Sequence, residues 1–245
     1  MEHKEYKRIV NGAKTAVLFI HGIIGTPNHF KDFLPLIPDN ISVHNILLRG
    51  HGKGVKDFSQ SSMRKWEEQV EKAVEELSAC HEKIIVIAHS MGTLFAIEQG
   101  VKNDKITDLF LIAVPIKLFI RAKMFTNVLK VFFNKIKLDD KIALAAKNCC
   151  GITLEKNIFK YLGWIPPYLG LFGKIHRTRK ILPMLKTSCT AYQSYNDEMV
   201  SLKSVEYLRS KSSMNVVELE NSGHYYYEDE DLKLMLRDFE KVLFI

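Results

Sequence analysis

The chain of 245 residues is 47% hydrophobic and 26% charged, with a formal net charge of +7. These proportions exclude an intrinsically disordered protein and are typical of a folded, soluble one. Every apolar run is shorter than the ~20 residues that a membrane-spanning helix requires, and residues 1–8 lack the apolar centre of a secretory signal. The four cysteines lack the spacing of a disulfide framework or a metal site, so we expect a reduced, cytoplasmic protein.

The predicted elements alternate along most of the chain. Apolar and β-branched runs predict strands at 5–10, 16–20, 41–47, 84–88, 106–114, 190–195 and 216–219. The helical spacing of apolar residues predicts helices at 27–36, 61–79, from 93 onward, 201–210 and 229–244. Buried strands that alternate with helices predict an α/β fold with a mainly parallel central sheet and helices on both faces.

Residues 116–186 interrupt this alternation. They are rich in large apolar side chains and contain 15 Lys and Arg against 3 Asp and Glu, a net charge of +12 that leaves −5 for the rest of the chain. We expect a basic, aromatic-rich helical insertion that lies outside the sheet. It would divide one core into two parts, residues 1–115 and 187–245.

Ser90 stands at the join between a buried strand and a helix. A serine on such a sharp turn, called a nucleophile elbow, requires small residues two positions before it and two positions after it. Here these residues are Ala88 and Gly92, whereas the usual pattern has glycine at both positions. An ordinary buried strand followed by a capped helix has the same local sequence. The interpretation therefore depends on whether partner residues follow in the right order.

Two later residues supply the base and the acid that a serine nucleophile requires. Asp197 follows the strand at 190–195, and His224 follows the strand at 216–219. Because the carboxyl ends of parallel strands meet at the edge of the sheet where ligands bind, we expect Ser90, Asp197 and His224 to form a catalytic triad. The alternatives are a helix N-cap for Asp197 and a surface turn for His224.

These motifs resemble those of the α/β-hydrolase superfamily, and within it the carboxylesterase and monoacylglycerol-lipase-like branch. The resemblance rests on the segments 21–25 (HGIIG), 49–52 (RGHG), 88–92 (AHSMG), 197–200 (DEMV) and 222–224 (SGH). It covers the core on both sides of the insertion but not the insertion itself. It implies that the backbone N–H groups of Ile23 and Met91 form the oxyanion hole. The position of Met91 at a helix start agrees, because N–H groups are unpaired there and favour an anion.

Other polar residues are assigned structural roles. We expect His21 and His89 to hydrogen-bond loop backbone near the site, and His51 to brace its own loop. No set of His, Asp or Glu has metal-ligand spacing, so we predict neither a metal nor a cofactor.

The predicted reaction is hydrolysis of a small-molecule carboxylic ester through an acyl-enzyme. A medium or long acyl ester is favoured, with monoacylglycerol one candidate, because aromatic residues of the insertion are available to line an acyl tunnel. We expect most of them to pack the insertion onto the core instead: Phe119, Phe125, Phe132, Phe133, Phe159, Tyr161, Trp164, Tyr168 and Phe172. A thioesterase and an amide or small-peptide hydrolase are alternatives on the same triad, and a non-enzymatic binding protein is a rival on the same fold.

The charge of the insertion adds a possible partner. Residues 124–137 form an amphipathic, basic helical pattern of the kind that docks on anionic membrane surfaces. The alternative is a helix of the insertion with a solvated basic face. We expect no nucleic-acid partner, because no recognised binding motif accompanies the charge.

Overall fold

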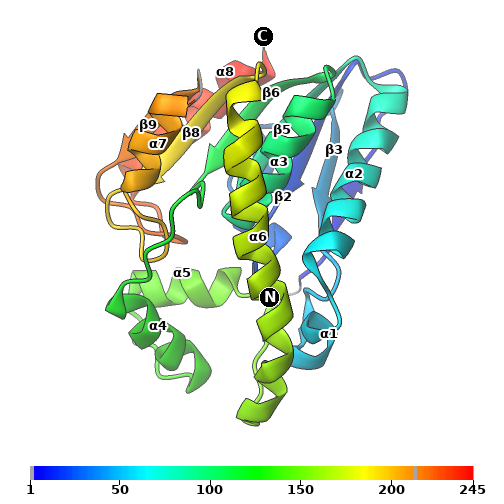
Figure 1. The fold of residues 1–245 in the computed structure, drawn as a ribbon. Coiled ribbons are helices and arrows are strands. Elements are labelled where there is room, and N and C mark those ends of the chain that lie inside the picture. The colour runs from blue at the N-terminus through cyan, green and yellow to red at the C-terminus, as the bar shows by residue number, and fades with distance from the viewer. Residues whose placement is uncertain (1–2, 212–213, 245) are drawn as a thin grey trace.

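The computed structural model describes residues 3–211 and 214–244, which fold around one central sheet. Its seven strands lie in the order β1 (Tyr6–Arg8), β3 (Ser42–Ile46), β2 (Thr15–Ile20), β5 (Lys83–His89), β6 (Ile106–Ile112), β8 (Ser188–Ser194) and β9 (Asn215–Leu219) (Figure 1). β1 is antiparallel to β3, and every other neighbouring pair is parallel. The predicted α/β architecture is confirmed.

Both faces of the sheet are covered, because successive side chains of each buried strand point to opposite faces. Leu18 of β2 packs in a cluster with α2 (Met63–Cys80), α3 (Met91–Lys102) and α7 (Lys203–Lys211). Its neighbour Phe19 packs in the opposite cluster, with α8 (Asp229–Leu243) and the loop after β2. The sheet is thus held rigid between two apolar layers, and its carboxyl edge carries the loops that follow β2, β5, β8 and β9.

The helix predicted at 27–36 was wrong. The segment forms two 3₁₀ turns instead, η1 (Pro27–Phe30) and η2 (Leu34–Leu36). Proline at position 35 has no N–H to donate to the carbonyl four residues earlier, so a continuous α-helix is interrupted there. A short helix that was not predicted, α1 (Val55–Ser59), follows the glycine-rich loop after β3.

The insertion, residues 116–186, adds no strand to the central sheet. It contains α4 (Ala122–Phe132), α5 (Lys141–Cys149), β7 (Ile152–Thr153), η3 (Ile158–Trp164), α6 (Ile165–Ile181) and η4 (Leu182–Met184). In Figure 1, α4 and α5 lie beyond one end of the sheet, whereas α6 runs from that end back along α3. The short strand β7 pairs in parallel with β4 (Lys53–Gly54), in a separate two-stranded sheet.

The insertion differs from the expectation in the length of its first helix. The helix predicted at 124–137 ends at Phe132, and Asn134 then adopts a left-handed φ of 51° that breaks the helical path. The division of the chain into a core and an insertion stays a prediction, because α6 packs closely on α2 and α3 of the core.

Candidate active site

Ser90 lies on a strained turn between β5 and α3. Its φ and ψ are 51° and −124°, a conformation that a residue with a side chain adopts only at a cost of roughly 1–3 kcal/mol. The turn is held by its own backbone: the N–H of Ser90 donates to the carbonyl of Ile112 at 2.9 Å, and its carbonyl accepts from the hydroxyl of Thr93 at 2.6 Å. The serine is thereby presented at the carboxyl edge of the sheet.

The two positions that flank the serine hold small residues for different reasons. A Cβ on Gly92 would lie 2.2 Å from the carbonyl oxygen of Ile20, so only glycine fits where α3 crosses the end of β2. Ala88 is fully buried, and its methyl group packs in the core beside α3. The departure from the usual glycine at this position is therefore accommodated by ordinary packing.

Asp197 and His224 lie together at the ends of β8 and β9. Nδ1 of His224 donates to Oδ2 of Asp197 at 2.8 Å, and both side chains are only 1% exposed. The other carboxylate oxygen of Asp197 accepts the backbone N–H groups of Met199 and Val200, each at 2.7 Å. With both oxygens held, Asp197 determines the orientation and the tautomer of His224, leaving Nε2 as the nitrogen available for base chemistry.

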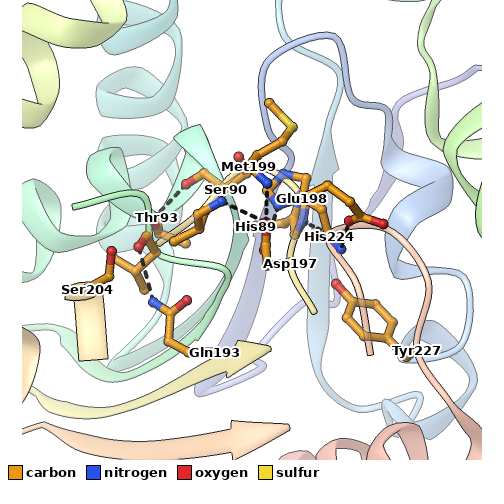
Figure 2. Close-up of polar contacts among 12 residues, drawn as sticks. His89, Ser90, Thr93, Gln193, Asp197, Glu198, Met199, Ser204, His224 and Tyr227 are labelled. Carbon is orange, nitrogen blue, oxygen red and sulfur yellow. Dashed lines mark hydrogen bonds and ion pairs between the residues drawn. The ribbon is translucent and has the colours of Figure 1, made fainter. Parts of the chain in front are cut away.

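The structure does not join Ser90 to His224 by a hydrogen bond. Nε2 of His224 is buried and has no hydrogen-bond partner among the residues that the structure describes. Figure 2 shows Ser90, Asp197 and His224 in one site, with Ser90 on the turn after His89. All three residues predicted from sequence are thus brought to the same edge, and only the acid–base pair is in direct contact.

The backbone of His224 is held from two sides. Its N–H donates to Oε2 of Glu198 at 2.9 Å, and its carbonyl oxygen accepts from Nε2 of His89 at 2.9 Å. His89 therefore contacts loop backbone, as expected. The contribution of Glu198 was missed, because adjacency to Asp197 was its only signal in the sequence.

The loop after β2 lies against the serine. A Cβ on Gly22 would lie 2.8 Å from Cβ of Ser90. Nδ1 of His21 donates to the carbonyl of Gly22 at 2.8 Å, and its Nε2 accepts the N–H of Leu48 at 3.1 Å. Burial lowers the pKa of His21 to about 4, so the ring is neutral at pH 7, as this hydrogen-bond pattern requires.

The two predicted oxyanion donors are available. Within residues 3–211 and 214–244, the backbone N–H groups of Ile23 and Met91 make no hydrogen bond. Ile24 has an unusual φ of 51°, and its carbonyl accepts the N–H of Gly151 at 2.7 Å. The carbonyl of Gly151 in turn accepts the N–H of Gly52 at 2.6 Å. The insertion is therefore bonded directly to the loop that carries Ile23.

A cavity of about 250 Å³ opens beside His224, between the core and the insertion. Its wall is mostly apolar and includes side chains of α4, α5 and α6 together with Glu198, Met199 and His224. Four of the nine aromatic residues of the insertion considered for an acyl tunnel lie on it, namely Phe132, Tyr161, Trp164 and Tyr168. The expectation that most of the nine pack the insertion onto the core was wrong, because five are 56–74% exposed: Phe119, Phe125, Phe133, Phe159 and Phe172.

Comparison with known proteins assigns the fold to a family. The model of a family described as the alpha/beta hydrolase family matches residues 17–235. The chain belongs to the alpha/beta hydrolase family. Membership of this family makes it a hydrolase, as the motifs at 21–25, 88–92 and 222–224 predicted.

Solved structures of other hydrolases share the fold. A structure described with LipS and LipT, two lipolytic enzymes from a metagenome, gives a TM-score of 0.75 at 16% identity over 99% of this chain and 97% of the other. A carboxylesterase structure from Nitrososphaera gargenis gives 0.71 at 16% identity, with 98% and 95% covered. The monoacylglycerol lipase of Paleococcus ferrophilus gives 0.67 at 16% identity, with 99% of each chain covered. No curated protein matches this hydrolase in sequence.

Two features are absent from the part of this hydrolase that the structure describes. No three His, Cys, Asp or Glu side chains there are arranged to hold a metal ion. No helix there is long and apolar enough to cross a membrane.

Proposed function

We propose that this hydrolase cleaves carboxylic esters through a triad of Ser90, His224 and Asp197. The observation that carries the proposal is the 2.8 Å hydrogen bond between Asp197 and Nδ1 of His224. Nε2 of His224 has no partner among the described residues, and Ser90 stands on its strained turn in the same site (Figure 2). A histidine held by a buried carboxylate through one nitrogen has the other nitrogen free to accept a proton.

The reaction proceeds in two halves. His224 Nε2 accepts the hydroxyl proton of Ser90 as Oγ bonds to the ester carbonyl carbon, and the carbonyl π electrons move to its oxygen. As the tetrahedral intermediate collapses, the bond to the alkoxy group breaks and His224 returns the proton to the leaving alcohol. Water then attacks the acyl-enzyme by the same route, releasing the carboxylic acid and restoring Ser90.

The oxyanion is stabilised by the backbone N–H groups of Ile23 and Met91. Both are unpaired within the described chain, and Gly22 brings the first loop within van der Waals contact of Ser90. Met91 is the first residue of α3, where the helix dipole favours negative charge.

The cavity supports a medium or long acyl ester as the substrate. Apolar walls formed by residues such as Ile24, Val131 and Leu154 favour burial of an alkyl chain over a charged acid. Monoacylglycerol is one candidate. A thioester and an amide require the same triad and remain the alternative substrates.

The exposed face of the insertion supports peripheral contact with an anionic membrane. Phe125, Leu129 and Phe133 are at least 54% exposed on or next to α4, and Lys123, Lys135 and Lys137 lie on the same segment. Flotation with anionic and neutral vesicles tests this contact, with binding expected only to the anionic vesicles at low salt. Equal binding to both would contradict an electrostatic contribution. The cytoplasmic location stays a prediction.

The experiment that tests the proposed function has two stages. A fluorophosphonate probe should label the wild-type protein and fail to label Ser90→Ala. A series of p-nitrophenyl esters should then show activity that rises from short to medium acyl chains and falls by several orders of magnitude in Ser90→Ala. Wild-type activity in Ser90→Ala would refute the triad, and an optimum at acetate would refute the acyl-chain preference. Absence of both labelling and ester hydrolysis in the wild-type protein would favour a binding protein.

A further inference from the structure

Asn127 is a polar residue in the mostly apolar wall of the cavity. It lies in the middle of α4, is only 6% exposed, and faces the cavity between the apolar side chains of Met124, Val128 and Val131. Its side-chain carboxamide makes no hydrogen bond with any residue that the structure describes. The nitrogen and oxygen of this carboxamide are not sealed inside the protein and stay accessible.

This placement lowers stability. Asparagine is a poor residue for a helix interior, by roughly 0.5 kcal/mol relative to leucine, and its carboxamide interrupts an otherwise apolar wall. A leucine at the same position would continue the apolar wall and favour the helix. A local choice that opposes both propensity and burial is expected where a residue serves a ligand.

Two tyrosine hydroxyls on the same wall also lack a hydrogen-bond partner among the described residues. Tyr168 and Tyr225 line the cavity, and neither hydroxyl has a hydrogen-bond partner in the described ranges. Burial raises the pKa of both, so each hydroxyl keeps its proton and can donate. Tyr161 differs: its hydroxyl donates to the carbonyl of Glu155 and accepts the N–H of the same residue, so it is satisfied by the protein.

We propose that Asn127, together with Tyr168 and Tyr225, forms a polar subsite that binds a hydroxyl group of the substrate. A carboxamide both donates and accepts, which matches a hydroxyl, and the phenols supply further donors. This inference rests on the proposed function and narrows it to esters that carry a free hydroxyl. His224 lines the same cavity. The hydroxyl belongs either to the alcohol part, as in a glycerol ester, or to the acyl chain, and the probes below distinguish the two.

Binding to Ser90→Ala tests the subsite without requiring turnover. Trp164 lies on the cavity wall, whereas Trp66 is fully buried in the core, so a change in tryptophan fluorescence reports occupation of the cavity. One pair of probes is 1-O-octylglycerol and octyl methyl ether, and the other is methyl 8-hydroxyoctanoate and methyl octanoate. We expect the hydroxylated member of at least one pair to bind roughly 10-fold tighter. The pair that shows the preference identifies which part of the substrate bears the hydroxyl.

The decisive variant is Asn127→Leu in the Ser90→Ala background. It should abolish the preference and leave the affinity for the plain ether or ester equal or higher. Val131→Ala is the matched control, because it changes the volume of the same wall without a polar group and should shift both members of a pair equally. Asn127→Leu should also raise the midpoint of thermal unfolding, so its folding is not in question.

The outcomes separate this inference from the proposed function. No preference in either pair, or an equal effect of Asn127→Leu on both members, overturns the subsite even when the enzyme is an active esterase. Absence of ester hydrolysis in the wild type overturns the proposed function, and the binding preference is still measured.

Discussion

The imidazole of His89 donates a hydrogen bond to the backbone carbonyl oxygen of His224, with 2.9 Å between Nε2 and the oxygen. The residue that precedes the proposed nucleophile thus holds the loop of the proposed base, and the two residues are far apart in the sequence. The ring of His89 also stacks on His29, with 3.9 Å between centroids. His89 is therefore positioned by one histidine while it positions another.

His89→Phe should separate these two contacts, because phenylalanine keeps the ring for stacking and lacks the N–H donor. We expect kcat/KM to fall roughly 10-fold, the usual effect of one lost hydrogen bond to a buried group, with little change in KM. Steady-state kinetics on a p-nitrophenyl ester measures the effect. An unchanged kcat, or a loss confined to KM, would show that the hydrogen bond does not position His224.

Asp197→Asn should nearly abolish activity while the protein stays folded. The amide no longer selects the tautomer of His224 that has Nε2 unprotonated, and it does not stabilise the charged ring. The expected fall in kcat is on the order of 10³- to 10⁴-fold. Asp108→Asn is the control and should retain full activity. Asp108 lies at the opposite end of the sheet, where β6 begins to pair with β8. Comparable losses in both variants would contradict the assignment of Asp197.

Two glycine-to-alanine changes should act in opposite directions. Gly92→Ala places a methyl group 2.2 Å from the carbonyl of Ile20, so we expect loss of both folding yield and activity. Gly173→Ala, within α6, meets no atom within 4 Å and should raise stability by about 0.5–1 kcal/mol through helix propensity. Urea denaturation of the purified proteins tests both, and a stable, active Gly92→Ala would disprove the close approach at the elbow.

Lys174 should be important for seating α6 on the core. Its side chain is 1% exposed, pairs with Glu98 of α3 and with Glu67 of α2 at 3.1 Å, and lies 5.1 Å from the ring centroid of Phe95. Lys174→Met should lower the free energy of unfolding by about 1–2 kcal/mol, because a buried charged hydrogen-bond donor is lost while Glu98 keeps Lys102 and Glu67 keeps Arg177 as partners. Lys180→Met, an exposed change on the same helix, is the control and should fall within about 0.5 kcal/mol of wild type.

Stability should fall as the pH is lowered from about 6.5. Burial, together with the neighbouring His224 and His21, lowers the pKa of His29 to about 3, and burial lowers that of His21 to about 4. Below the unfolded-state pKa of ~6.5 the unfolded chain binds protons that the folded chain does not, so each residue weakens the fold by up to about 1.4 kcal/mol per pH unit until its folded pKa is reached.

His29→Phe isolates one of these contributions. The variant keeps a ring against His89 but cannot be protonated, so its free energy of unfolding should decline less steeply between pH 6.5 and 4 than that of the wild type. Urea denaturation at several pH values measures the slopes. Parallel slopes for the two proteins would show that His29 is not protonated on acid unfolding.

The strand positions and the serine turn were accessible from sequence because each has a local cause. Continuous apolar runs predict buried parallel strands, and the elbow requires small residues at fixed positions such as Gly92. The failures are of another kind. The break at Pro35 and the end of α4 near Asn134 depend on single backbone conformations, and a helical pattern of apolar residues does not report them.

The cavity wall also contains polar residues whose burial and contacts the sequence pattern does not report. An amphipathic pattern assigns every polar residue of α4 to the solvent side, so Asn127 was invisible as a buried group. Glu198 likewise has no motif, and only the fold brings it to the N–H of His224. Contacts made across the fold by a single polar atom are the part of this site that sequence did not predict.

Gly151 has a consequence for how the enzyme releases its product. Its N–H is bonded to Ile24 and its carbonyl to Gly52, and a Cβ at this position would lie 2.2 Å from the carbonyl of Gly25. Lifting the whole insertion as one lid would break both hydrogen bonds and pull on the loop that carries Ile23, a proposed oxyanion donor. Substrate entry and product exit are therefore coupled to the chemical step through one residue. An alteration at Gly151 would change turnover and substrate access together.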